Sequence, residues 1–504
     1  MPLSADEPIR TLIAIDMIYD GNYISPKLNG ETYLNKPPLY NWILVGFIKI
    51  FGSVEEWVIR LPSILSLLLF AGVIGYITNK ELPNKKVGWI VGLSFLTTGN
   101  IIIYSSYLGH IDITYSLVTF LQIYLLYHFS SKNKWWQAFT VSYGLAFVGF
   151  MMKGLPSIVF QGISILVLLY VFKSIRKLIS KEHVVSSLVF VFPLLLYLYL
   201  FSLNDDVSSL LNKLVLESGS RTIADKSFME SISHIFTFPF TYFVDIFPWG
   251  IMSLILFSSS SRKIIRSNPF LKICLLLFLS NIIVYWLSPD YRARYVFMLT
   301  PFLLIPSIYC FRILVPLKWT KRITVGVGVA VLLSIVGMYV YANYSSQSYV
   351  SPFNFFVLII LGGFMLFGIF RNKNRKYFYY FLVFSLAMGR IGYSYYMVPY
   401  RVMSGPYLTE KLEGEEIAKI THGEPLAMYN CNVSNTMNWY ITINRHKSLC
   451  TVTEDYSFDS YYLVPTEVIK DTSNITTYYT FVRRFESKPF SLVKFKYRFP
   501  EMPK

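Results

Sequence analysis

Charged side chains beside long apolar segments are the residues of this sequence that indicate chemistry. Asp6 and Glu7 are adjacent carboxylates, and a carboxylate near a membrane surface acts as a general base when burial raises its pKa. Lys36 precedes Pro37 and Pro38 at the expected start of a short amphipathic helix. A lysine fixed there lies at the depth of lipid phosphates. The alternative interpretations are a solvated acidic pair and a lysine that reaches toward the headgroups.

Three further cations lie at the ends of apolar segments. Lys153 stands between two such segments, and Arg292 and Arg294 precede another. A charge at this depth costs insertion energy unless it is paired or faces a polar cavity. Together with Lys36, these cations would suit the phosphate or diphosphate of a lipid whose tail runs between helices. A side chain that extends toward the lipid headgroups would explain any one of these cations. It does not explain four of them on the outer face, where Lys and Arg are disfavoured.

His110 and Asp112 close a tight connection between two apolar segments. A histidine and a carboxylate are only two of the ligands that a metal needs, so we assign no metal, although a divalent ion stays open. We interpret Asp112 as a residue that orients a substrate hydroxyl or a cation, with a simple helix cap as the alternative. Zincin, nucleotide-binding loop, dinucleotide and paired-cysteine motifs do not occur in the sequence.

The composition predicts the elements that position these residues. The chain is 54% hydrophobic and 15% charged, with a mean hydropathy of +0.46, which is typical of an all-α polytopic membrane protein. About twelve segments are long enough to span a bilayer. We expect spans at 56–79, 87–106, 111–130, 135–152, 156–173, 184–203, 238–258, 270–287, 295–314, 323–342, 354–370 and 377–397.

Basic residues gather in alternate connections, which predicts the orientation in the membrane. The connections near residues 80–86, 132–134, 173–181, 262–266, 318–322 and 371–376 are rich in Lys and Arg, so they should face the cytoplasm. The candidate site residues all lie in the other set. We therefore predict a multi-pass protein of the inner (plasma) membrane with its active site facing the periplasm or exterior. Topology accounts for the net charge of +17, and we expect no nucleic-acid partner.

Three domains are expected. Residues 1–54 should form an extracytoplasmic loop with helices at 6–19 and 40–51, and residues 55–400 the membrane domain. Residues 401–504 should form a small extracytoplasmic α+β domain, with a helix at 408–420. Its expected strands lie at 426–429, 438–443, 461–464, 478–482 and 492–497.

Cys431 and Cys450 fall in the outer domain, where a disulfide and two free thiols are equal alternatives.

The sequence opens without an apolar signal region, yet the predicted orientation puts its first residue outside. We therefore expect a preceding span, which would make thirteen in the full protein.

An ordered series of motifs resembles a known family. The series comprises Asp6-Glu7, Asp20 to Pro26, Leu28-Asn29-Gly30, Tyr33, Lys36-Pro37-Pro38, Trp42, Phe51-Gly52, Arg60 to Ser63, Asp112, Lys153 to Pro156 and Phe247-Pro248-Trp249. It resembles bacterial GT-C membrane glycosyltransferases of the aminoarabinose lipid A transferase and protein O-mannosyltransferase group. The resemblance implies a GT-C-like fold and a polyprenyl-phosphate sugar as donor.

The resemblance also implies roles for individual residues. Asp6 would be the catalytic carboxylate, and Lys36, Lys153 and an arginine of the Arg292–Arg294 pair would bind the donor phosphate. Substrate positioning is assigned to Glu7, Tyr33, His110, Asp112 and Arg221. Asn35 replaces a glutamate of some aminoarabinose transferases and the 204–236 loop is not histidine-rich, which leaves a matching metal site and a lipid A acceptor without support.

The expected function is the transfer of a sugar from a polyprenyl-phosphate donor to a lipid, glycan or protein acceptor, with membrane lipids as further partners. The alternative is a transporter or flippase of polyprenyl-linked saccharide. Transport predicts functional charges near the bilayer midplane, whereas the charges of this sequence gather at one face.

Overall fold

The computed structural model describes residues 1–83, 86–219, 228–345, 352–452, 460–469, 475–483 and 488–496. The chain divides into two compact units. Unit 1 contains residues 1–34, 40–59 and 401–504, and unit 2 contains residues 35–39 and 60–400. The segment before the first long helix therefore belongs to the same compact unit as the C-terminal segment.

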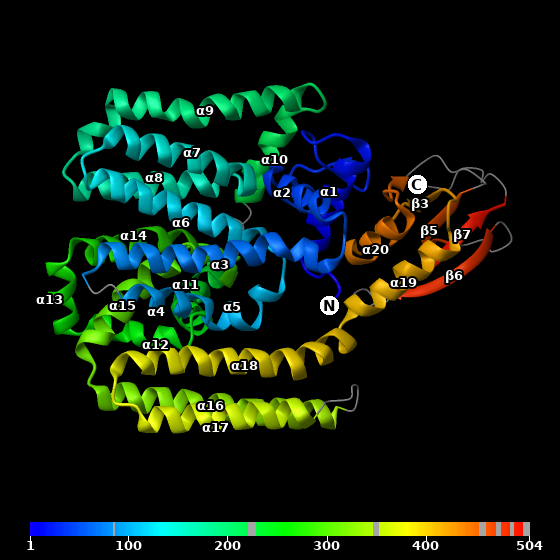
Figure 1. The fold of residues 1–504 in the computed structure, drawn as a ribbon. Coiled ribbons are helices and arrows are strands. Elements are labelled where there is room, and N and C mark those ends of the chain that lie inside the picture. Colours follow the sequence, from blue (N-terminus) through cyan, green and yellow to red (C-terminus); the bar gives the residue numbers. More distant parts are fainter. Residues whose placement is uncertain are drawn as a thin grey trace. The chain divides into compact units, whose positions relative to one another are not determined.

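Unit 2 is built from helices, most of which run side by side (Figure 1). It includes most of α3 (Glu56–Glu81), then α4 (Val87–Leu96), α5 (Gly99–Ile103), α6 (Ile111–Ser130), α7 (Trp135–Lys153), α8 (Pro156–Val171), α9 (Lys181–Ser202), α10 (Val207–Gly219), α11 (Phe228–Asp245), α12 (Trp249–Ser253), α13 (Ser259–Ser267), α14 (Pro269–Trp286), α15 (Thr300–Leu314), α16 (Leu317–Tyr344), α17 (Pro352–Arg371) and most of α18 (Arg375–Ser404). Each predicted span falls on helical residues, which confirms the helical fold class.

Two of the predicted spans are broken. The helix at 87–106 bends by 49° between α4 and α5, where Thr97 and Thr98 donate their hydroxyls to carbonyls of the preceding turn. The span predicted at 238–258 was wrong as one helix, because α11 and α12 bend by 113°. Pro248 lies at this break, and a proline cannot supply a helical N–H.

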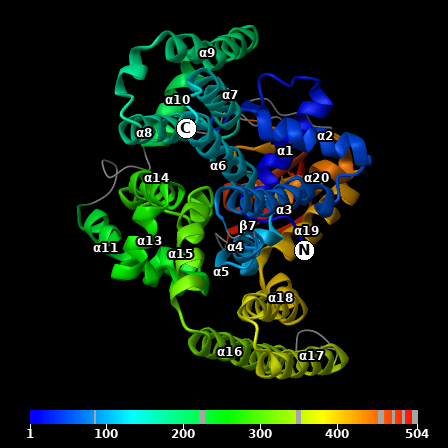
Figure 2. The ribbon, with the colours of Figure 1, turned by 60° about the vertical axis from the view of Figure 1, so that its left-hand side comes forward.

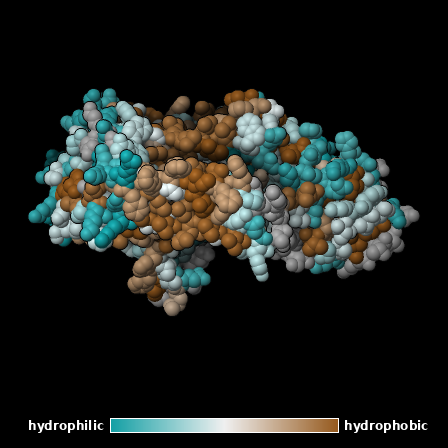
Figure 3. Space-filling model, turned by 60° about the horizontal axis from the view of Figure 1, so that its bottom comes forward, coloured by the Kyte–Doolittle hydropathy of each residue, from teal (hydrophilic) through white to brown (hydrophobic). Residues whose placement is uncertain are grey.

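Within the described residues, five helices are long and apolar enough to cross a membrane, or up to seven if each bent pair counts as one span. The apolar helices α8 and α15 are shorter, at 16 and 15 residues. The number of about twelve spans therefore stays a prediction. On the face of the molecule drawn in Figure 3, hydrophobic residues cover much of the surface.

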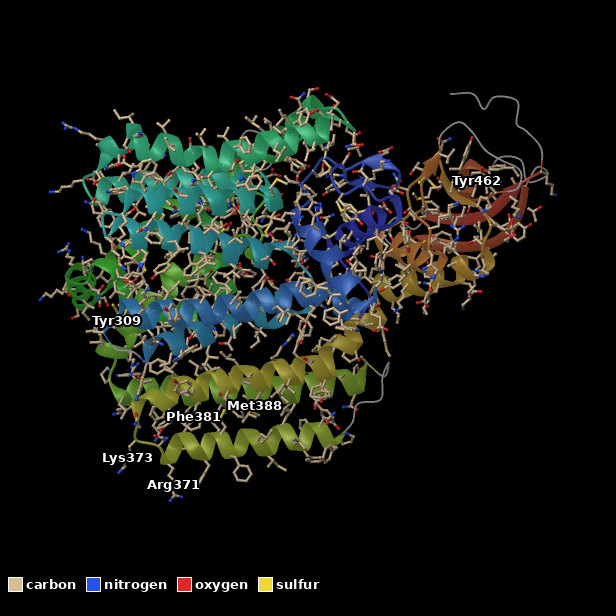
Figure 4. The ribbon with its side chains drawn as sticks, turned by 45° about the horizontal axis from the view of Figure 1, so that its top comes forward. Tyr309, Arg371, Lys373, Phe381, Met388 and Tyr462 are labelled. Atoms are coloured by element: carbon tan, nitrogen blue, oxygen red, sulfur yellow. The ribbon has the colours of Figure 1, made fainter. Side chains whose placement is uncertain are left out.

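Three helices form a group with its own packing core. Figures 1 and 2 show α16, α17 and α18 lying side by side. Their contact buries Ile335 and Ala342 of α16, Met365 and Ile369 of α17, and Phe378 of α18. Figure 4 shows Arg371 and Lys373 projecting from the connection between α17 and α18. This is one of the basic connections that the sequence assigns to the cytoplasmic side.

Glycines allow close approach where unit 2 holds its buried charges. Gly154 has φ +78 and ends α7 directly after Lys153, so the chain reverses within two residues before α8 begins at Pro156. A Cβ atom on Gly149 would lie 2.8 Å from the Ser157 hydroxyl and 3.5 Å from the Tyr115 ring. Glycine at position 149 therefore lets α7 pack tightly against α8 and α6.

Unit 1 combines the first elements of the chain with the last. It contains α1 (Glu7–Asp20), the hairpin of β1 (Lys27–Leu28) and β2 (Glu31–Thr32), nearly all of α2 (Leu39–Phe51), the first residues of α3, α19 (Pro406–Ile420) and α20 (Asn435–Arg445). Strands β3 (Leu426–Tyr429), β4 (Thr451–Val452), β5 (Tyr461–Pro465), β6 (Ile475–Arg483) and β7 (Lys488–Phe495) make a sheet in the order β4-β3-β5-β7-β6.

The sheet of unit 1 is mixed, and one face carries an apolar core. β3 is parallel to β4 and β5, whereas β7 is antiparallel to β5 and β6. The core includes Ile417 of α19, Met437 and Ile441 of α20, and Met428 and Leu463 of the sheet. The α+β character predicted for residues 401–504 is therefore confirmed.

One predicted strand of this region was wrong. Residues 438–443 lie within helix α20 (Asn435–Arg445). The alternation of Trp439, Ile441 and Ile443 resembles a strand, but Ser434 accepts a hydrogen bond from the Met437 N–H and starts a helix that is buried along most of its length. Cys431 and Cys450 are not joined by a disulfide.

Candidate active site

Asp112, Lys153 and Arg294 form a buried ionic cluster in unit 2. Asp112 lies in the first turn of α6, Lys153 is the last residue of α7, and Arg294 lies in a short 3-10 turn (Ala293–Val296) before α15. The Lys153 Nζ is 2.5 Å from Asp112 Oδ1, and the Arg294 Nε is 3.0 Å from Asp112 Oδ2. Each side chain is at most 7% exposed. The two sides of one carboxylate therefore hold two cations together.

The charges of this cluster do not cancel. Asp112, Lys153 and Arg294 together carry a formal charge of +1, because two cations share one carboxylate. Lys36 is half-buried and interacts favourably with the Asp112 carboxylate, which adds a further cation to the same region. A buried surplus of positive charge attracts an anion, because little water is present to screen it.

Aromatic rings restrict the ammonium group of Lys153. Its Nζ lies 4.1 Å from the centre of the Tyr295 ring and 5.1 Å from that of Tyr115. Both tyrosines are buried, and cations are attracted to the faces of such rings. Neither tyrosine was predicted from the sequence. Tyr115 follows Asp112 by three residues on α6 and Tyr295 follows Arg294 directly, so helical spacing would have indicated Tyr115.

His110 is the second neighbour of Arg294. Its Nε2 lies 3.2 Å from Nη1 of Arg294. Arginine only donates hydrogen bonds, so Nε2 of His110 is the acceptor in this pair. The His110 carbonyl accepts a hydrogen bond from the Ser63 hydroxyl at 3.0 Å, which ties the start of α6 to α3. Within the described ranges, no group of three or more His, Cys, Asp or Glu side chains is arranged to hold a metal ion.

The structure separates the two arginines that the sequence grouped. Arg294 is 6% exposed and belongs to the cluster, whereas the Arg292 side chain is exposed. The prediction that one arginine of the pair joins Lys153 therefore concerns Arg294. Arg221 lies outside the described residues.

The remaining predicted residues belong to unit 1. Asp6 occupies the N-cap position of α1 without a capping hydrogen bond from its side chain. Glu7 is 1% exposed and accepts a hydrogen bond from the Ser4 N–H at 3.0 Å. The Tyr33 hydroxyl accepts a hydrogen bond from Arg10 Nη2 at 2.6 Å. Arg10 is 4% exposed and was not predicted from the sequence, although it follows Asp6 by one helical turn. Unit 1 therefore combines the predicted carboxylates with a buried cation.

Comparison with solved structures identifies the fold. Crystal structures of ArnT from Cupriavidus metallidurans, one bound to undecaprenyl phosphate and one in the apo state, align with TM-scores of 0.70 and 0.69. Each alignment covers 98% of this chain and 94% of the other at 16% identity. The chain has the ArnT fold.

Sequence comparisons agree with this fold. Residues 35–202 match the family described as dolichyl-phosphate-mannose-protein mannosyltransferase. An uncharacterized protein of Aquifex aeolicus (strain VF5) is 30% identical over 121 residues, and this match spans about a quarter of either protein, 24% of each. The resemblance to the GT-C group of ArnT and the protein mannosyltransferases is therefore confirmed. The matched range 35–202 contains Lys36, His110, Asp112 and Lys153.

Proposed function

We propose that this protein is a GT-C glycosyltransferase that transfers a sugar from a polyprenyl-phosphate donor to a lipid, glycan or protein acceptor. The observation that carries the proposal is the buried cationic cluster of Asp112, Lys153 and Arg294 within an ArnT fold. One ArnT structure of this fold is bound to undecaprenyl phosphate. A surplus positive charge between apolar helices suits the phosphate of such a lipid.

The charge balance of the reaction explains why the cluster keeps this surplus. The acceptor hydroxyl attacks the anomeric carbon of the sugar, a new C–O bond forms, and the bond from that carbon to the phosphate oxygen breaks. The donor phosphate is a diester with one negative charge, and the polyprenyl phosphate that leaves is a monoester with a charge of about −1.5 to −2. Lys153, Arg294 and Lys36 therefore stabilise charge that develops in the transition state.

In this proposal the carboxylates have different roles. Asp112 holds the ammonium of Lys153 and the guanidinium of Arg294 side by side, so that both face one phosphate. Asp6 removes the proton from the acceptor hydroxyl as general base. Glu7, whose carboxylate accepts from the Ser4 N–H, fixes the start of α1. His110 and Tyr33 position neighbouring groups through Arg294 and Arg10 respectively.

The orientation in the membrane supports a lipid-linked donor. Asp112 begins α6, and α6 extends over 20 residues, about 30 Å, before the connection that holds Lys132 and Lys134. The cluster and this basic connection therefore lie at opposite ends of the same helix. With the basic end in the cytoplasm, the cluster faces the periplasm or exterior, where a lipid carrier must deliver the sugar.

A reconstituted assay tests the proposal. The purified protein is placed in liposomes with a polyprenyl-phosphate sugar, and mass spectrometry follows the donor, free polyprenyl phosphate and glycosylated envelope acceptors. The proposal predicts polyprenyl phosphate in amounts equal to the glycosylated acceptor. Movement of intact donor between leaflets with no cleavage of the sugar bond would contradict it and identify a flippase. Comparing envelope lipids and glycans of a deletion strain with the parent then identifies the sugar and the acceptor.

A further inference from the structure

The segment just before Asp6 is held by the C-terminal part of the chain. Leu3 is fully buried, and its N–H donates a hydrogen bond to the Tyr440 hydroxyl at 3.1 Å. The Leu3 carbonyl accepts from the Thr436 hydroxyl at 3.4 Å. Thr436 and Tyr440 are one turn apart on α20, so one face of this helix binds both backbone groups of one residue.

The Tyr440 hydroxyl belongs to a larger network within unit 1. Besides accepting from Leu3, it donates to the Glu56 carboxylate at 2.8 Å. The same oxygen of Glu56 accepts from Lys411 Nζ at 2.9 Å. Tyr440 is 2% exposed, and a buried hydroxyl that both donates and accepts is fixed in direction. The network therefore joins α19, α20, the first turn of α3 and the N-terminal segment.

The chain between Leu3 and Asp6 transmits this restraint. Ser4 and Glu7 are joined by two hydrogen bonds, from the Ser4 N–H to the Glu7 carboxylate at 3.0 Å and from the Glu7 N–H to the Ser4 carbonyl at 3.1 Å. Ala5 lies between them with φ +54, a left-handed conformation that is unfavourable for a residue with a Cβ. Such a conformation persists when its surroundings determine it, and here Ser4 and Glu7 determine it on both sides.

We propose that α20 positions Asp6, with Thr436 and Tyr440 as the positioning residues. The inference rests on the proposed function, in which Asp6 is the general base. Neither hydroxyl contacts donor or acceptor in this proposal; each acts through Leu3 and the bonded turn of Ser4 to Glu7. The C-terminal domain is then part of the catalytic apparatus, because it fixes the position of the Asp6 carboxylate.

The experiment separates a role in positioning from a role in folding alone. Full-length protein in lipid nanodiscs is measured for kcat, for KM toward the polyprenyl-phosphate sugar, for binding of polyprenyl phosphate and for its unfolding temperature. The variants are Tyr440→Phe, Thr436→Val and Thr436→Ser, the last of which keeps the hydroxyl. Tyr478→Phe is the matched control, because Tyr478 is an exposed tyrosine of β6 in the same domain.

Displacement of a catalytic group by about 1 Å costs up to about a hundredfold in rate. We expect Tyr440→Phe and Thr436→Val to lower kcat by about 5- to 50-fold, with KM and phosphate binding within about twofold of wild type. Thr436→Ser should recover most of the rate, and Tyr478→Phe should equal wild type. If Tyr440→Phe fails to fold, the Thr436 pair decides the question.

The outcomes also distinguish this inference from the proposed function. Wild-type kcat in folded Thr436→Val and Tyr440→Phe, beside an inactive Asp6→Asn, would overturn the positioning role alone. An Asp6→Asn variant with the wild-type rate would instead overturn the general base on which the inference rests. A parallel loss of kcat, donor binding and unfolding temperature, unrelieved by Thr436→Ser, would assign α20 a structural role only.

Discussion

Removing the Asp112 carboxylate should expose how strongly the cationic cluster is coupled. Asp112→Asn keeps the size of the side chain but leaves Lys153 and Arg294 as two buried cations without their shared anion. Their nitrogens lie 2.5 and 3.0 Å from the two oxygens of one carboxylate. Breaking a buried ion pair by removing one partner costs about 3–5 kcal/mol, so Asp112→Asn should lower the free energy of unfolding by about that amount.

A double-mutant cycle tests whether this loss comes from the charges. Lys153→Met removes one cation while retaining an apolar side chain of similar length, and leaves Asp112 paired with Arg294. In the Asp112→Asn, Lys153→Met double variant only one buried cation lacks its partner. We expect the double variant to be more stable than the sum of the single losses predicts, by an interaction energy of about 1–3 kcal/mol. Unfolding by denaturant in one fixed detergent, followed by tryptophan fluorescence, measures all four proteins.

The same variants link stability to ligand binding. With Asp112 neutralised, the surplus charge of the cluster rises from one to two, so polyprenyl phosphate should raise the unfolding temperature of Asp112→Asn more than that of wild type. Additive losses within about 0.5 kcal/mol, with equal stabilisation by the lipid, would refute the view that Asp112 holds two phosphate-binding cations together.

The other predictions concern single charges. Lys153→Met should weaken binding of polyprenyl phosphate by about 1.5–3 kcal/mol, the contribution of a hydrogen bond to a charged group; Lys134→Met, at the other end of α7, should bind as wild type in the same titration. Lys36→Ala should weaken binding by a similar amount and show a smaller decrease of affinity with added salt. Asp6→Asn should bind the lipid normally, and its rate of sugar transfer should fall by about a hundredfold or more. A normal rate of transfer would exclude Asp6 as the base. Burial, partly offset by the Ser448 hydroxyl, raises the pKa of Asp16 to about 7. This group therefore stabilises the fold fully below about pH 4 and loses that contribution, at most about 4 kcal/mol, as the pH rises to about 7. Asp16→Asn should be more stable than wild type at pH 8 and nearly equal to it below about pH 4 in thermal unfolding.

Much of the helical fold could be predicted from sequence because the membrane imposes simple rules. Apolar length alone placed helices on α3, α6 and α9, and a lysine between two apolar segments identified the end of α7. The breaks near Thr98 and Pro248 were missed, because apolar residues continue on both sides of each short polar interruption. At the first break Thr97 and Thr98 bond to carbonyls of the preceding turn. Pro248 lies at the second, but prolines also lie inside α3, α9 and α15, so a proline alone does not indicate where a helix ends.

The members of the site were easier to predict than the contacts among them. Lys153, Arg294 and Asp112 were each identified because a charge near an apolar segment needs an explanation. Sequence spacing does not show that they share one carboxylate, since 41 residues separate Asp112 from Lys153 and the pairing depends on how α6 and α7 pack. Tyr295 was overlooked because tyrosine is common near membrane surfaces. Its ring indicates a site only once the position of the Lys153 ammonium is known.

The pairing of opposite charges changes how the cations are interpreted as phosphate ligands. Four independent cations would bind a phosphate strongly, yet each would carry its own cost of burial in the absence of lipid. Asp112 offsets part of that cost for Lys153 and Arg294 together, and it leaves one positive charge in excess. A donor phosphate with a single negative charge matches that excess, and the extra charge that appears on the leaving phosphate needs the further cation at Lys36. In this scheme Asp112 limits the net charge of the cluster to about that of the bound donor, and Lys36 supplies the further positive charge that the transition state needs. The cluster then stabilises the transition state more than the ground state.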